Sequence, residues 1–233
     1  MSFCYVSISL KFKIQGFKMR IFKTKSHIAS SDYLEPQETI IDKAAKQFLY
    51  QTSLAYTLAT EVIKPKTHEW WNPIKGTNII LGAIPLKNKG HHVKILNQVD
   101  KQDGSKPKLA VLTLLEPFEI HSKGPFSTPV TPKTWKKLGV EHRIISAKDF
   151  KPLSQSEIKE SVHFLEKQSS LGVPTYVHCK AGRGRSATAV VCFLMKKYGY
   201  SAEKAKSKVF ESRSQINLNS HQWKAIKDYE RSL

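Results

Sequence analysis

Cysteine is scarce in this chain of 233 residues. The three cysteines, Cys4, Cys179 and Cys192, are too few for a disulfide framework and are typical of a reducing compartment. Cys192 lies about 20 Å beyond Cys179 along one predicted helix, so it is a poor disulfide partner, and we expect it to be a buried apolar residue. No cysteine or histidine spacing of a zinc site is present. We therefore expect no metal and no cofactor.

Acidic residues are also few. The chain has 19 aspartates and glutamates against 38 lysines and arginines, which gives a formal net charge of +19. Such an excess favours an anionic partner, such as a phospholipid surface or a polyphosphorylated substrate. A lysine-biased genome would produce the same charge, and charge alone does not separate the two explanations. Because no nucleic-acid recognition module accompanies the charge, we expect no nucleic-acid partner.

Long uncharged apolar runs are missing as well, and none approaches the roughly 18–20 residues that cross a bilayer. The first 31 residues contain no acidic residue, and their basic residues follow the first apolar stretch, which argues against a secretory signal. We expect residues 1–35 to be a basic, poorly ordered arm; a transit peptide or a membrane-surface segment would have the same composition. The protein is then cytoplasmic or peripheral to a membrane, or mitochondrial if the source is eukaryotic.

The remaining sequence is organised as one helix followed by an α/β domain. Apolar residues recur at helical spacing through residues 36–66, which indicates an N-terminal helical extension that ends before Pro65. Apolar strands then alternate with amphipathic helices through residues 67–233, among them a buried strand at 109–114. This alternation predicts an α/β fold with a central, mainly parallel sheet flanked by helices.

One stretch, residues 178–186, combines cysteine, glycine and arginine in the order HCKAGRGRS. A short β-branched and aromatic run precedes it, and a long apolar run, predicted to be a helix, follows it. The stretch therefore lies where a strand ends and a helix begins. The amide groups of a helix's first turn have no partners there, and the helix dipole favours negative charge. We predict an anion-binding loop.

The residue types indicate what is done to the anion. Cys179 lies among amide groups and a guanidinium that favour the thiolate, which makes it a candidate nucleophile. Arg185 offers a fork that matches two phosphoryl oxygens, and Ser186 can hydrogen-bond the sulfur as it leaves an intermediate. The loop residues that would bind the phosphate through their amides or side chains are Lys180, Ala181, Gly182, Arg183 and Gly184. A buried cysteine in a glycine-containing turn is the simpler alternative, and a Walker-type loop is excluded because no Gly-Lys-Ser/Thr follows the glycines.

Asp149 is the candidate general acid. A phosphate monoester needs a proton on its leaving oxygen, and Asp149 stands in a polar loop just past the predicted strand 143–146. The same carboxylate would then activate the water that hydrolyses a phosphocysteine. A solvated loop aspartate is the alternative reading.

The motif His-Cys-(five residues)-Arg-Ser resembles the signature of the cysteine-dependent protein tyrosine and dual-specificity phosphatases. Stretches from residue 48 to about 230, including 81–86, 135–141 and 176–188, are similar in collinear order to the mitochondrial-type family that dephosphorylates phosphatidylglycerophosphate. The resemblance implies a dual-specificity phosphatase-like fold with residues 67–233 as the catalytic domain. It also implies an acidic loop near the site, with Glu116 and Glu119 in supporting positions.

The side chains within the loop bear on the substrate. Lys180 and Arg183 add positive charge beside the phosphate site, as in inositol-lipid phosphatases, although ion pairs with neighbouring acids would explain them equally well. His178 is expected to order the loop by hydrogen bonding rather than to act as a base. We expect a phosphatase acting on a phospholipid headgroup, with a phosphoprotein substrate as the second hypothesis. A catalytically weak phosphate-binding module is the third.

Overall fold

The computed structural model describes residues 39–65, 67–99, 108–124 and 127–233. The basic arm predicted for residues 1–35, with Cys4, lies outside the described residues. The described chain from Thr39 to Leu233 forms one compact unit.

A five-stranded sheet forms the centre of this unit. Four of its strands run parallel and the fifth, β1, pairs antiparallel with β2 at one edge, which confirms the predicted, mainly parallel sheet. In sheet order the strands are β1 (Trp71–Pro73), β2 (Ile79–Gly82), β5 (Thr175–His178), β3 (Ala110–Leu114) and β4 (Glu141–Ile145). The pattern did not predict β1, because a three-residue edge strand that ends in proline carries no periodicity.

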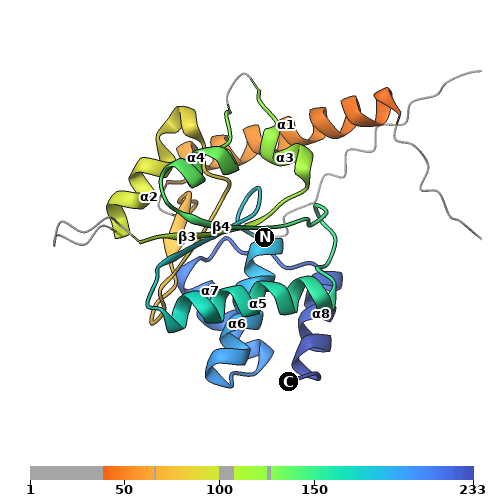
Figure 1. Ribbon diagram of the computed structural model, residues 1–233. Helices are drawn as coiled ribbons and strands as arrows, with labels where there is room; N and C mark the ends of the chain where they lie inside the picture. The colour runs from red at the N-terminus through yellow and green to blue at the C-terminus, as the bar shows by residue number, and fades with distance from the viewer. Residues whose placement is uncertain (1–38, 66, 100–107, 125–126) are drawn as a thin grey trace, which may run out of the picture. The chain divides into compact units, whose positions relative to one another are not determined.

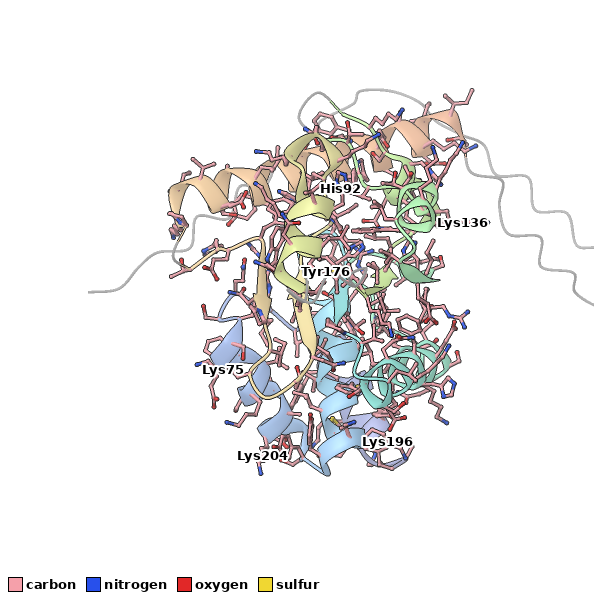
Figure 2. The ribbon with its side chains drawn as sticks, turned by 60° about the vertical axis from the view of Figure 1, so that its left-hand side comes forward. Lys75, His92, Lys136, Tyr176, Lys196 and Lys204 are labelled. Carbon is pink, nitrogen blue, oxygen red and sulfur yellow. The ribbon has the colours of Figure 1, made fainter. Side chains whose placement is uncertain are left out.

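Helices cover both faces of the sheet (Figure 1). One face carries α5 (Gln155–Ser170), α6 (Arg185–Tyr198), α7 (Ala202–Ser212) and α8 (Ser220–Glu230). The other side carries α1 (Ile40–Ile63), α2 (His91–Val99), α3 (Pro117–His121) and α4 (Pro132–Lys137), with a short 3-10 turn at Lys87–Lys89. Figure 2 shows the same layers from the side, with Tyr176 of the central strand inside and Lys75, Lys196 and Lys204 toward the end away from α1.

The helix boundaries follow from side chains at their ends. Ser154, Ser201 and Asn219 each accept a hydrogen bond from a first-turn amide of the helix that follows, as their sequence positions predict. Gly199 ends α6 with φ of 64°, a left-handed conformation that glycine adopts without steric cost. These local signals explain why α5 to α8 begin and end where they do.

Helix α6 is the centre of the core. Every residue from Arg185 to Met195 is buried, because the helix packs against the sheet, α5, α7 and α8. Cys192 is fully buried and burial raises the pKa of its thiol, so it is an apolar core residue, as predicted. Each fully buried valine, leucine or phenylalanine stabilises the fold by roughly 1.5–3 kcal/mol. The loop that precedes α6 is thus anchored to a helix that is buried over most of its length.

Helix α1 packs differently. A capping box between Thr39 and Asp42 begins it, and Tyr50, Leu54 and Thr57 are its buried residues. The predicted N-terminal helix is confirmed, and it lies across the molecule above the sheet (Figure 1). Among the described residues, no helix has both the length and the hydropathy needed to cross a membrane.

Candidate active site

The loop from Cys179 to Gly184 begins where β5 ends and leads directly into α6. Strand β5 lies between β2 and β3, so the loop stands at the carboxyl edge of the central strand. Cys179 is buried at the start of this loop, with 3% of its surface exposed. The predicted strand, loop and helix are therefore all present.

Four consecutive carbonyl groups of the loop accept hydrogen bonds from other segments of the chain. The Ile84 amide donates to the Lys180 carbonyl (3.0 Å), and the Asn217 amide donates to the Arg183 carbonyl (3.0 Å). Between them, Arg213 donates from Nη2 to the Ala181 carbonyl (3.3 Å) and from Nε to the Gly182 carbonyl (2.9 Å). Since a trans peptide holds its N–H opposite its C=O, these contacts turn the following amides toward the other side, where an anion can bind.

Gly182 is required by the shape of the loop. Its φ is +66°, and a Cβ at this position would lie 2.3 Å from the carbonyl oxygen of Gly82. Neither the backbone angle nor the contact with backbone tolerates a side chain. Strand β2 and the loop can therefore approach each other only with glycine here.

The environment of Cys179 favours the thiolate. Burial opposes ionisation, but the Arg185 guanidinium and hydrogen bonds from Ser186 outweigh it and lower the pKa of the thiol. The Ser186 hydroxyl donates to Sγ over 3.3 Å. The thiolate is the form that attacks phosphorus, and the site shifts the thiol toward it.

Arg185 is held in a buried ion pair. Its Nη1 and Nη2 donate to the two carboxylate oxygens of Glu119 (2.6 and 3.1 Å), and both side chains are 1% exposed. Nη1 also donates to the Ala147 carbonyl (2.8 Å), whereas Nε has no partner among the described residues. This two-pronged contact fixes the plane of the guanidinium. Glu119 thus holds the Arg185 guanidinium in one orientation.

His178 lies beneath the loop. Its Nε2 is 2.8 Å from the Thr113 hydroxyl and its Nδ1 is 3.1 Å from the Cys179 carbonyl oxygen. Burial lowers the pKa of His178 to about 3, so the ring is neutral at physiological pH. A neutral, doubly hydrogen-bonded ring positions the cysteine backbone, which is in line with the ordering role expected for it.

Asp149 lies above the loop, in the connection between β4 and α5. Its carboxylate forms ion pairs with Nζ of Lys180 and, at 3.0 Å, with Nη2 of Arg185. It also accepts a hydrogen bond from the Phe150 amide (3.1 Å). The structure therefore brings the candidate acid together with Lys180 of the loop and Arg185 at the start of α6.

Comparison with known proteins decides the family. Residues 108–232 match the family model of the dual specificity phosphatase catalytic domain. The chain belongs to the dual-specificity phosphatases. The predicted family and fold are confirmed.

Individual relatives agree with this assignment. The chain is 32% identical to the Arabidopsis thaliana phosphatidylglycerophosphate phosphatase PTPMT1 over 84% of its length, but spans only 52% of that relative. It is 29% identical to the Mus musculus phosphatidylglycerophosphatase and protein-tyrosine phosphatase 1, covering 83% of this chain and 93% of the relative. A crystal structure of PTPMT1 in complex with PI(5)P is 32% identical with a TM-score of 0.58, covering 70% of this chain and 96% of that one.

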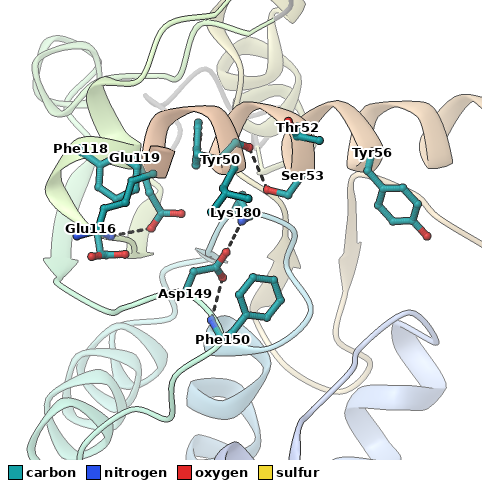
Figure 3. Close-up of a pocket in the computed structure, with 12 residues that line it drawn as sticks. Tyr50, Thr52, Ser53, Tyr56, Glu116, Phe118, Glu119, Asp149, Phe150 and Lys180 are labelled. Atoms are coloured by element: carbon teal, nitrogen blue, oxygen red, sulfur yellow. Dashed lines mark hydrogen bonds and ion pairs between the residues drawn. The ribbon is translucent and has the colours of Figure 1, made fainter. Parts of the chain in front are cut away.

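Helix α1 borders two adjoining cavities at the loop, and Figure 3 shows the one that α1 forms with α3 and the Asp149 loop. The cavity of about 250 Å³ that contains Cys179 and Arg185 also touches Ser53, Tyr56 and Thr57 of α1. An adjoining cavity of about 450 Å³ lies between α1, α3 and the Asp149 loop, and Lys180 and Phe150 border both. The catalytic loop thus opens into a larger, mostly apolar space.

One expected segment of the site has a different structure, and two residues that contact the site were given no role in the sequence analysis. The resemblance implied an acidic loop at residues 116–119, but the segment is the start of α3, because Pro117 suits the first helical position and Glu116 and Glu119 form a capping box. Arg213 and Thr113 carry no motif spacing, so the sequence did not assign them a role. Only the folded chain brings these two residues to the loop.

Proposed function

We propose that this phosphatase hydrolyses a phosphate monoester through a phosphocysteine intermediate and that its substrate is a phospholipid headgroup. The observation that carries the first part is the pairing of Cys179 with Ser186 at the floor of a pocket whose loop amides face inward. A nucleophile, an anion-binding loop and an acid in one pocket match the requirements of this reaction.

The reaction would proceed in two displacements. Sγ of Cys179 attacks phosphorus, the bond to the leaving oxygen breaks, and Asp149 gives that oxygen its proton. Asp149 then takes a proton from water as the water oxygen attacks phosphorus, and Sγ leaves with a hydrogen bond from Ser186. Arg185 and the loop amides hold the equatorial oxygens in both steps. The incoming phosphate competes with the Asp149 carboxylate for Nη2 of Arg185.

The lipid part of the proposal is supported by the walls of the pocket. Lys180 and Arg183 border the phosphate site, and the adjoining cavity is lined by Leu49, Tyr50 and Phe118. A headgroup with a second charged group and an apolar remainder fits these two environments together. Relatives named for phosphatidylglycerophosphate, and the structure containing PI(5)P, support the same substrate class.

A phosphoprotein is the second candidate, because the mouse relative is also named a protein-tyrosine phosphatase. The apolar cavity beside the loop favours the lipid, since a phosphotyrosine ring would fill only part of it. A lipid substrate would place the protein at a membrane surface, on the cytoplasmic side or in mitochondria.

Phosphate release by the wild type and by Cys179→Ser tests the proposal. The panel holds phosphatidylglycerophosphate, several phosphoinositides and phosphotyrosine peptides at equal concentration. We expect release by the wild type alone, fastest on one lipid. Fastest release from the peptides would replace the lipid proposal with the protein one, and no release by a folded wild type would favour a binding module.

A further inference from the structure

The outward face of α1 is apolar. We define this outer face by Phe48, Leu49, Tyr56, Val62 and Ile63, whose exposed fractions lie between 62% and 75%. The other exposed residues between positions 44 and 63 are three alanines, a threonine and a single charged residue, Lys46. Nearly the whole exposed surface of this stretch is therefore uncharged.

This pattern is the reverse of an ordinary surface helix. Such a helix buries one apolar stripe and presents charged residues to water. In α1, Tyr50, Leu54 and Thr57 face the protein, yet large apolar side chains face outward as well. Within the part of the chain that the structure describes, no element covers them, since their side chains are exposed. A contiguous exposed apolar surface of this kind marks a site of association.

The outer face continues into the rim of the catalytic pocket. Leu49 and Tyr56 belong to the outer face and also border the cavities beside Lys180. Phe150, which is 73% exposed, lies across from α1 at the same opening (Figure 3). Apolar side chains therefore border the entrance from two sides, while the phosphate-binding loop lies at its base.

We propose that the outer face of α1, together with Phe150, docks on the surface of an anionic phospholipid bilayer. This rests on the proposed lipid substrate: a headgroup could enter the pocket while its acyl chains stay in the bilayer. Exposed lysines lie near both ends of the helix and beside Phe150, at Lys43, Lys64 and Lys151, and their positive charge favours a surface of anionic lipids. Apolar insertion flanked by basic residues is how interfacial helices bind membranes.

The test uses the full chain and vesicles of phosphatidylcholine with or without phosphatidylglycerol. The variant Phe48→Glu/Val62→Glu changes two outer-face positions that do not line the catalytic pocket. The matched control, Leu171→Glu/Phe210→Glu, changes two exposed apolar residues at the end of α5 and in α7. We expect the outer-face variant to bind anionic vesicles at least about tenfold more weakly, and the control to bind as the wild type does. Hydrolysis of p-nitrophenyl phosphate should be unchanged in both.

Three results would overturn the docking proposal. The wild type could fail to bind anionic vesicles, or the outer-face variant could bind them as tightly as the wild type, which would assign binding to other parts of the chain. A wild-type dimer that the outer-face variant alone dissociates, with vesicle binding unchanged, would make the face an interface between two copies.

A soluble short-chain phosphatidylglycerophosphate separates this proposal from the proposed function. We expect the outer-face variant to hydrolyse the soluble lipid normally and the same headgroup in vesicles at least about tenfold more slowly. If the wild type hydrolyses neither lipid but still binds vesicles through the outer face, the substrate proposal fails while docking stands.

Discussion

The catalytic loop and helix α1 border the same pocket but are held in place in different ways. The loop is tied by backbone and arginine hydrogen bonds from two other segments, one after β2 and one between α7 and α8, and it continues into α6, which is buried from Arg185 to Met195. Helix α1 contributes three buried residues over 24 positions and keeps large apolar side chains exposed. From this difference we propose a division of work, in which the loop performs the chemistry and the α1 wall selects what reaches it.

The division predicts that loop variants lower kcat and that wall variants raise KM. Arg185→Lys should have the largest effect. A lysine keeps the charge but loses the fork that meets both Glu119 and the phosphate, so we expect kcat/KM to fall by about a thousandfold. Steady-state kinetics on p-nitrophenyl phosphate would measure this, with the exposed Arg143→Lys as the control. A loss below tenfold would mean that the amides alone bind the phosphate.

Asp149→Asn tests whether Asp149 is the general acid of the reaction at the loop. The amide cannot protonate a leaving oxygen, so we expect kcat to fall about a hundredfold on substrates with poor leaving groups. A substrate whose leaving group needs no proton should lose far less. Normal turnover of a poor leaving group at acidic pH would remove the proposed role and leave Asp149 as an ion-pair partner of Lys180 and Arg185.

Arg213→Gln removes the support behind the loop. Burial lowers the pKa of Arg213 to about 10, so the side chain is still charged at neutral pH, and it donates to backbone oxygens of Ala181, Gly182 and Glu69. Leaving these acceptors unpaired should lower the free energy of unfolding by about 3–5 kcal/mol. We expect kcat to fall by roughly tenfold or more as the loop amides lose their orientation.

Urea unfolding and kinetics on the same samples measure both effects. Arg231→Gln, at an exposed helix end, is the matched control. A stable Arg213→Gln protein with normal kcat would show that the loop shape does not depend on contacts from behind.

Much of the structure around the catalytic loop could be predicted from the sequence. Residues 178–186 are contiguous, so their spacing alone indicated a strand, an anion-binding turn and a helix. The caps of α5, α7 and α8 are equally local. Contacts between distant segments were not predictable: Thr113 reaches His178 across the sheet, and Arg213 reaches the loop from beyond α7.

For α1, the helix could be predicted from the sequence, but its buried side could not. Its helical spacing showed that it is a helix, but apolar residues on both sides of it could not show which side packs on the domain. The fold resolves this by burying Tyr50 and Leu54 and leaving Phe48 and Leu49 exposed. Likewise, only the fold reveals that the Asp149 carboxylate pairs with Lys180 over the loop.

Ser186→Ala should shift the pH profile with a smaller loss of rate. The Ser186 hydrogen bond and the Arg185 charge lower the pKa of Cys179 against the effect of burial, so removing the hydroxyl should raise that pKa. The thiolate fraction then falls at a given pH, and the acidic limb of alkylation by iodoacetamide moves up by about half a unit to one unit. An unchanged limb would assign the low pKa to Arg185 and the loop amides alone.

Tyr50→Phe should have the smallest effect and tests the wall directly. The Tyr50 hydroxyl is buried beside the cavity, has no hydrogen-bond partner among the described residues, and burial raises its pKa, so it keeps its proton. Removing an unpaired hydroxyl should leave the free energy of unfolding unchanged or raise it by up to about 1 kcal/mol. If that hydroxyl binds the headgroup, KM for the lipid rises about threefold with kcat unchanged, a factor equal to roughly one weak hydrogen bond. Tyr200→Phe, remote from the pocket, is the control. A fall in kcat for Tyr50→Phe would instead mean that this residue of the α1 wall takes part in the chemical step.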